Sequence, residues 1–212
     1  MGPLVNRRRH VVYRFDGPTP EPLPLSGQRR SLVLDPDVVR HYFGRSPDDR
    51  SRLRVSLRLL ARGCIGTLIV DGDEWASVGW ISHPGSMAPP HLTRQIIGRS
   101  VLWSFAAHTR PAFRRQGLLK ATFRMRIALA RQAVDDPNAV IHNDVSINNT
   151  KSRRAQLGAG LVPAGQLRWL RIRVPGVSLW TWGVWDVDAE HPPLAEPERD
   201  AGPGRAPVLT YR

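Results

Sequence analysis

A basic segment between two apolar stretches carries the clearest chemical signal in this sequence. It runs from Thr109 to Lys120 as Thr-Arg-Pro-Ala-Phe-Arg-Arg-Gln-Gly-Leu-Leu-Lys, and it joins a predicted strand, 100–109, to a predicted helix, 118–134. The first backbone N–H groups of a helix have no acceptor inside the helix, and the helix dipole places partial positive charge there. Gly117 lets the main chain approach a ligand closely. These features predict an anion site that suits a diphosphate.

A second polar pattern follows another predicted strand, 139–146. It reads Asn149-x-x-Ser152-x-x-x-Gln156-x-x-x-Gly160-Leu161. Together with the first segment, Thr109-x-Pro111-x-Phe113-Arg114-Arg115-Gln116-Gly117-Leu118-Leu119, it resembles the acetyl-CoA-binding motifs of the GNAT superfamily of N-acetyltransferases. The two motifs occur in the expected order and at the expected distance, and a looser match of strand order extends over residues 34–187.

The resemblance implies a fold, a reaction and a set of cofactor-binding residues. The fold is expected to be α/β (α+β), with a mixed, mostly antiparallel central sheet, a V-shaped splay between two strands, and flanking helices. The expected reaction is direct transfer of an acyl group, acetyl in the first place, from acetyl-CoA or another acyl-CoA to an amine, with no covalent enzyme intermediate. The residues expected to bind CoA are Thr109, Arg114, Arg115, Gln116, Gly117, Leu118, Leu119, Lys120, Asn149 and Ser152.

Three positions depart from the family pattern. Leu119 stands where Gly or Ala is usual, and Leu161 replaces Phe. Gln156 replaces the tyrosine that often protonates the leaving thiolate, and an amide cannot act as a general acid at neutral pH. A thiol with a pKa of about 8.5 leaves with little help from an acid, so activity is compatible with Gln156. A catalytically inactive CoA-binding or regulatory module is the alternative.

Direct transfer to an amine needs a group that accepts a proton, because only a neutral amine attacks the thioester. Two candidates are Asp144, on the predicted strand 139–146, and His108, near the end of the strand 100–109. A structural role stays open for both residues. The 7 histidines show no spacing typical of metal ligands, so we expect no metal ion.

The charge balance favours anionic partners. Lys and Arg number 31 and Asp and Glu 18, which gives 31 − 18 = +13 at neutral pH. Because such a surplus also suits nucleic acid, a GNAT-like enzyme that modifies nucleic-acid bases is an alternative to one that acts on a small-molecule or amino-sugar amine. A basic stripe on one predicted helix is interpreted as a solvated face; it consists of Arg50, Arg54, Arg58 and Arg62.

Periodicity and capping signals predict the elements that position these residues. Predicted helices cover 35–44, 46–63, 118–134 and 150–157, and predicted strands cover 10–15, 64–70, 75–82, 100–109, 139–146, 166–174 and 179–187. This order indicates a mixed α/β domain. Trp180 and Trp182 share one face of the last strand, where we expect them to pack against the sheet; lining an acceptor pocket is the alternative.

We expect three parts in the chain. Residues 1–30 form a basic strand and a Pro-rich connector, 31–188 the acyltransferase domain, and 189–212 a Pro-rich disordered tail. The single cysteine excludes an internal disulfide. The sequence lacks an apolar run of about 18 residues, so no membrane span is expected, and the absence of a secretory signal predicts a cytoplasmic protein. Association into a homodimer stays open.

Overall fold

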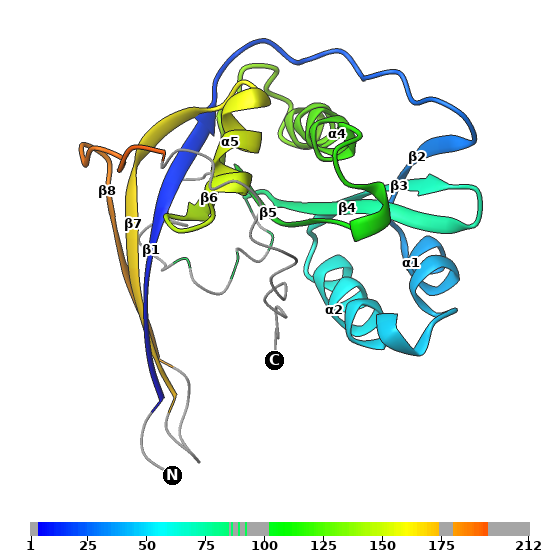
Figure 1. Cartoon of the computed structure of the whole chain (residues 1–212), viewed down its shortest axis with the longest axis horizontal. Helices are drawn as coiled ribbons and strands as arrows, with labels where there is room; N and C mark the ends of the chain where they lie inside the picture. Colours follow the sequence, from blue (N-terminus) through cyan, green and yellow to red (C-terminus); the bar gives the residue numbers. More distant parts are fainter. Residues whose placement is uncertain are drawn as a thin grey trace.

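The structure is a computed structural model that describes residues 4–84, 86, 89, 92, 102–173 and 180–194. In that part of the chain, eight strands form one sheet in the order β2-β3-β4-β5-β6-β1-β7-β8 (Figure 1). Neighbouring strands are antiparallel except β5 and β6, which run parallel. The strands are β1 (Leu4–Phe15), β2 (Arg29–Val33), β3 (Ile65–Asp71), β4 (Glu74–Ser82), β5 (Leu102–Thr109), β6 (Ile141–Ser146), β7 (Val162–Arg173) and β8 (Trp180–Asp186).

Helices cover both faces of this sheet. Figure 1 shows α1 and α2 on one face and α4 and α5 on the other. The predicted helices are confirmed as α1 (Pro36–Phe43), α2 (Arg50–Ala61), α4 (Leu118–Ala133) and α5 (Thr150–Gly158), with short 3-10 turns at Pro47–Asp49 and Pro111–Phe113. None of the helices in the described ranges is long and apolar enough to cross a membrane. The expectations for 100–101, 174, 179 and 195–212 concern positions outside the described residues.

Capping explains where α1 begins. Asp35 has an extended backbone, and its carboxylate accepts hydrogen bonds from the backbone N–H groups of Asp37 and Val38, both at 2.8 Å. Pro36 occupies the first helical position, where its missing N–H costs nothing. The sequence signal at this helix therefore acts as expected.

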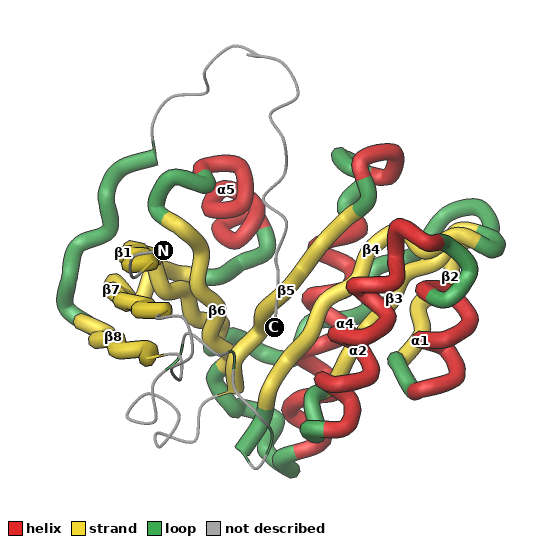
Figure 2. Tube along the Cα trace, turned by 90° about the horizontal axis from the view of Figure 1, so that it is seen from below, coloured by secondary structure: helices red, strands yellow, loops and turns green. Residues whose placement is uncertain are grey.

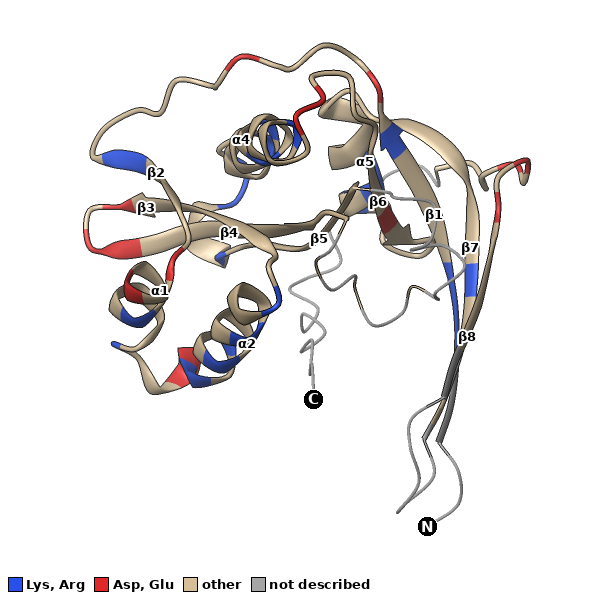
Figure 3. Ribbon diagram, turned by 180° about the vertical axis from the view of Figure 1, so that it is seen from behind, with Lys and Arg blue, Asp and Glu red and all other residues tan. Residues whose placement is uncertain are grey.

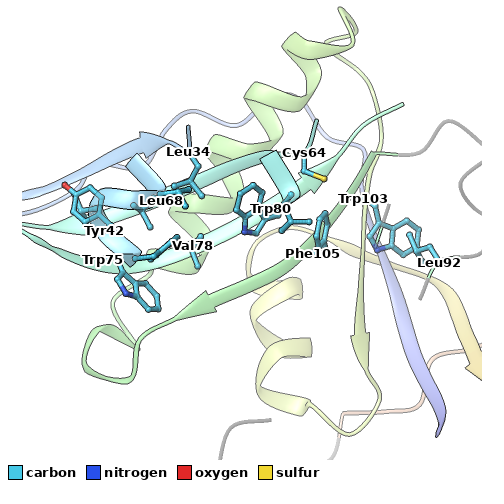
Figure 4. Packing of buried hydrophobic residues seen from close by; sticks show 14 of the residues in the cluster. Leu34, Tyr42, Cys64, Leu68, Trp75, Val78, Trp80, Leu92, Trp103 and Phe105 are labelled. Atoms are coloured by element: carbon cyan, nitrogen blue, oxygen red, sulfur yellow. The ribbon is translucent and has the colours of Figure 1, made fainter. Parts of the chain in front are cut away.

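Two hydrophobic clusters hold the layers together. One lies between the sheet and α1 and α2. It includes Trp75, Val78, Trp80 and Phe105, and Figure 4 shows these side chains spread along β4 and β5. The other lies between the sheet and α4 and α5. Its buried members include Ile81, Leu102, Phe123, Ile127, Ile141 and Leu161. Successive residues of β5 therefore contribute to opposite faces, as strand geometry requires.

The strand nearest the start of the chain lies inside the sheet. β1 pairs with β6 from His10 to Phe15 and with β7 from Leu4 to Arg14. The sequence predicted only its second half, because Arg7, Arg8 and Arg9 interrupt the apolar pattern. Strand β2 was not predicted, and it pairs with β3 at the other end of the sheet.

The interface between α4 and the sheet contains a buried guanidinium. Arg126 is 1% exposed, and it makes no ion pair with any acidic residue in the described part of the chain. Its Nη1 donates to Thr67 Oγ1 at 3.2 Å, while its Nε has no acceptor among the described residues. A Cβ on Gly79 would lie 2.0 Å from the Arg126 Nη1 atom, so the glycine makes room for the guanidinium. Burial lowers the pKa of Arg126 to about 9.

Replacement of this buried cation should stabilise the protein. We expect Arg126→Met to raise the free energy of unfolding by about 1–2 kcal/mol, because an apolar side chain of similar length removes the desolvation cost of an unpaired charge. Urea denaturation measures the difference. Arg131→Met on the same helix is the control and should lower stability, since Arg131 donates to Ala139 O, Thr19 Oγ1 and Gly17 O at 2.8–3.0 Å. Equal losses in the two variants would contradict the argument.

Candidate functional site

The candidate site lies where β5 and β6 separate. In the described strands, their parallel pairing joins Leu102–Ser104 to Ile141–Asn143 and stops there. Figure 2 shows the two strands diverging beyond this contact. β5 also has a bulge against β4, and Ala106 takes a φ of +49° in it. The inner edge of β5 beyond Ser104 can therefore pair with an extended ligand.

The predicted anion cradle forms at the open end of this V. Gly117 is left-handed, with a φ of +73°, and α4 begins at the next residue. The first-turn N–H groups, Leu118–Lys120, have no acceptor within the helix, and no described side chain caps it. A Cβ placed on Gly117 would meet no atom within 4 Å, so the space beside it is open. Free donors, open space and the helix dipole together suit a phosphate group.

Several side chains of the cradle maintain its shape. Arg114 Nε donates to the Thr109 carbonyl oxygen at 3.3 Å, and Gln116 Nε2 donates to the Ala112 carbonyl oxygen at 3.3 Å. The Leu118 side chain is buried, so this residue can offer a ligand only its backbone. The predicted residues from Thr109 to Lys120 thus form the end of β5, the connecting turn and the start of α4, and part of their side-chain hydrogen bonding is already used.

Arg115 occupies a strained position within the cradle. Its φ is +64°, in the left-handed region that costs a residue other than glycine about 1–2 kcal/mol. The neighbouring Gln116 is held from outside the loop by Arg29, whose Nη2 donates to Gln116 Oε1 and whose Nε lies 2.9 Å from Asp71 Oδ2. Strain of this kind persists where the surrounding structure fixes the backbone, and it is typical of ligand-binding loops.

The second motif begins at the N-terminus of α5. Asn149 Oδ1 accepts a hydrogen bond from the Ser152 backbone N–H at 3.1 Å, so the asparagine caps the helix. Gln156, which stands at the tyrosine position of the family pattern, is 6% exposed. The roles of Asn149 and Ser152 in cofactor binding stay predictions.

Asp144 lies at the apex of the V, on the face of the sheet that α1 and α2 cover farther along. It is the first residue of β6 after the last pair with β5. Its side chain is 4% exposed. Trp103 Nε1 donates to Asp144 Oδ1 at 2.7 Å, and His10 Nδ1 lies 2.5 Å from Asp144 Oδ2. His10 comes from β1 and is not among the predicted site residues.

Aromatic rings surround this carboxylate. The Trp103 and His142 rings stack at 5.7 Å with an interplanar angle of 17°. Trp185 meets both rings edge-on, at 5.8 Å from Trp103 and 5.1 Å from His142. His10 meets Trp169 edge-on at 5.8 Å. We call these five residues the aromatic cluster; flat rings of this kind suit contact with a ring-shaped or apolar ligand.

Solved structures share this architecture. The sequence matches no protein-family model and no curated protein. A putative GNAT-family acetyltransferase from Novosphingobium aromaticivorans superposes with a TM-score of 0.54 at 13% identity, over 81% of this chain and 66% of that chain. A tandem GNAT protein from the clavulanic acid biosynthesis pathway gives 0.55 at 11% identity, over 83% and 53%. A Drosophila protein gives 0.55 at 15% identity, over 82% and 53%.

The chain has the GNAT fold. It spans 66% of the Novosphingobium structure and 53% of each of the other two. The expected fold class, with its mostly antiparallel sheet and its V-shaped splay, is confirmed.

The other predicted proton acceptor, His108, lies farther along β5, next to Thr109. Its ring centroid is 5.8 Å from that of Trp75, at an interplanar angle of 46°. Burial, followed by the positive charges of Arg52 and Arg114, lowers the pKa of His108 to about 4. An imidazole with so low a pKa is a weak proton acceptor near neutral pH. The catalytic role of His108 stays a prediction, and the lowered pKa of His108 argues against it.

The exposed tryptophan and the basic stripe lie away from the aromatic cluster. Trp182 is 64% exposed and pairs with Leu170 across the edge of the sheet, so the expected packing of Trp182 against the sheet is wrong. The Trp180 side chain is outside the described residues. Arg50, Arg54, Arg58 and Arg62 are exposed on or just after α2, which confirms the interpretation as a solvated face. Figure 3 shows basic positions along this helix in blue.

Relief of backbone strain in the cradle should be measurable. We expect Arg115→Gly to raise the free energy of unfolding by about 0.5–1 kcal/mol, because glycine adopts the left-handed region without a steric cost. Chemical denaturation measures the change. The control is Arg114→Gly at an ordinary extended position, φ −71° and ψ 162°, where glycine should only destabilise. A loss of stability in both variants would show that Arg115 is not strained.

The buried histidine of the aromatic cluster should make stability depend on pH. Burial, followed by the charge of Arg14, lowers the pKa of His142 to about 4, and its Nδ1 has no hydrogen-bond partner among the described residues. The unfolded chain takes up a proton below about pH 6.5 while the folded chain does not, so stability falls as pH decreases from 6.5 towards 4. Between pH 7 and 4.5 we expect the natural chain to lose about 2 kcal/mol more than His142→Phe, which keeps a stacked ring. Parallel stability curves for the two proteins would refute this.

Proposed function

We propose that this protein is an acyl-CoA-dependent N-acyltransferase that transfers an acyl group, acetyl in the first place, directly to the amine of a small molecule or amino sugar. One observation supports it most strongly. The N-terminus of α4 is uncapped and follows a left-handed glycine, and it comes soon after β5, whose edge towards β6 is unpaired beyond Ser104. A diphosphate suits the N-terminus of α4, and a long arm that carries amide groups suits the unpaired edge of β5. CoA has this chemistry.

Backbone groups and side chains would both contribute to the binding of an acyl-CoA. The N–H groups at the start of α4 would hold the diphosphate, with charge from Arg114 and Arg115. The edge of β5 between Phe105 and Thr109 would pair with the amides of pantetheine, and a backbone N–H there would polarise the thioester carbonyl. CoA supplies a thiolate leaving group, so the chain needs no residue to activate the thiol.

The acceptor would attack beside the aromatic cluster. Its amine must be neutral to attack, and the pair formed by Asp144 and His10 at the apex of the V is the candidate proton acceptor. Gln156 donates no proton at neutral pH, and the thiolate of CoA would take its proton from water. The flat rings of Trp103 and Trp185 favour an acceptor with a ring, which agrees with an amino sugar or a small metabolite.

Ligand-dependent stabilisation tests the cofactor site. Acetyl-CoA at about 100 times its Kd should stabilise the natural chain by about 2.7 kcal/mol, which raises the Tm by roughly 5–10 °C for a chain of this size. The variant Arg115→Glu with Gly117→Asp should show no shift, because it puts negative charge into the cradle. The matched control is Arg58→Glu with Gly27→Asp: Arg58 is exposed, and Gly27 is also left-handed, at φ +68°, with open space around it.

The control variant should keep the full shift. Absence of a shift in the natural chain at millimolar acetyl-CoA would refute the cofactor site. Turnover is then followed as thiol release from acetyl-CoA in the presence of amino sugars, polyamines and aminoglycosides. A shift without thiol release on any of these amines would favour the alternative of a binding or regulatory module.

A further inference from the structure

His10 and Asp144 form a buried pair on the face of the sheet that carries the aromatic cluster. Their side chains are 16% and 4% exposed, and His10 Nδ1 lies 2.5 Å from Asp144 Oδ2. The residues are 134 positions apart in sequence. The pairing of β1 with β6 brings them together, because Val12 lies opposite Asp144 and His10 lies opposite Ser146, one step along the same face.

The surroundings of this pair are apolar, so its presence needs a reason. Val12, Trp103 and Leu167 are fully buried on the same face. A buried carboxylate costs desolvation energy unless it is paired, and apolar residues of similar volume are often at least as stable in such a place. His10 and Trp103 hold the Asp144 carboxylate from both sides, since Trp103 Nε1 donates to its other oxygen at 2.7 Å. The arrangement fixes an imidazole in one orientation.

We propose that His10, oriented by Asp144, accepts the proton of the attacking amine. The proposal rests on the proposed function. With Nδ1–H donated to the carboxylate, the lone pair of the ring is at Nε2, as in other carboxylate–histidine pairs. His10 is the better acceptor of the two, because both oxygens of Asp144 already accept hydrogen bonds and an imidazole is intrinsically more basic than a carboxylate. Asp144 is then a positioning residue.

The position of the pair relative to the cradle agrees with this role. From Thr109, beside the cradle, back to Ser104, the last residue paired with β6, the strand advances five residues, or about 17 Å. An extended pantetheine arm spans such a length. An arm that starts at the N-terminus of α4 and follows the edge of β5 therefore places its sulfur near the apex of the V, where β6 presents Asp144.

The step balances without a further reactant. The lone pair of the neutral amine forms the new C–N bond, and the C–S bond of the thioester breaks with its electron pair on sulfur. The proton released by the nitrogen goes to His10 Nε2. The CoA thiolate then takes a proton from solvent, and His10 returns its proton to solvent before the next cycle.

An affinity label tests the position of His10 without an identified acceptor. Bromoacetyl-CoA carries an electrophilic carbon next to the thioester, and we expect it to alkylate His10, with excess CoA preventing the reaction. Peptide mass spectrometry locates the adduct. His10→Asn should not be labelled there, although its amide can still donate to Asp144. His41→Asn, at an exposed position on α1, is the control and should be labelled as the natural chain is.

The outcomes separate this proposal from the proposed function. A CoA-protected adduct on another residue, such as Cys64, or no protected adduct in a chain that acetyl-CoA stabilises, would overturn the role of His10 alone. No stabilisation by acetyl-CoA would overturn the cofactor site and the His10 proposal with it. If His10 in Asp144→Asn is labelled to the same extent as in the natural chain, Asp144 does not orient His10.

Kinetics and spectroscopy give a second test. In an amine assay, His10→Asn should lower kcat by about 100-fold or more while the KM for acetyl-CoA stays unchanged, as loss of a general base predicts. A downfield N–H proton resonance from the His10–Asp144 bond should be present in the natural chain and absent in both His10→Asn and Asp144→Asn. An unchanged kcat in His10→Asn would rule out proton transfer to this residue.

Discussion

Three residue pairs between β5 and β6 keep the two halves of the sheet together. One half contains β2, β3, β4 and β5, and the other contains β6, β1, β7 and β8; all contacts within each half are antiparallel. The join is parallel and ends at Ser104 and Asn143. Both residues are buried and each has a side-chain oxygen without a partner among the described residues. The sheet is thus continuous at its base and open above it, which creates a slot without a break in the hydrophobic core.

The two sides of the slot offer different chemistry. The α4 side offers backbone N–H groups and a helix dipole, which recognise phosphate whatever the side chains are. The other side offers side chains from β1, β5, β6, β7 and β8, gathered as the aromatic cluster around Asp144. Under the proposed function, the cofactor, which is common to many enzymes, and the acceptor, which is particular to one enzyme, would be bound by separate parts of the molecule. This division explains why the cofactor motif is legible in the sequence while the acceptor is not.

Local signals in the sequence predicted the elements well. Asp35 and Gly117 mark helix starts by capping and by turn geometry, which depend only on neighbouring residues. Contacts between distant segments could not be predicted in the same way. His10 looked like one of several isolated histidines, because nothing local shows that β1 lies beside β6. Trp182 was assigned to the wrong environment because alternation along a strand shows which residues share a face and does not show what covers that face.

The place of β1 in the sheet has a consequence for how the chain reaches this structure. β1 is made first, while its neighbours, β6 and β7, lie at 141–146 and 162–173 and are made late. Until β6 has been synthesised, β1 has no strand to pair with, and this half of the sheet cannot begin to form. Such long-range pairing is slow, and an unpaired strand with apolar residues such as Val11 and Val12 is a site for aggregation. The arginines at positions 7–9 interrupt the apolar pattern of β1. They also add charge to the unpaired strand and so oppose its association with other copies.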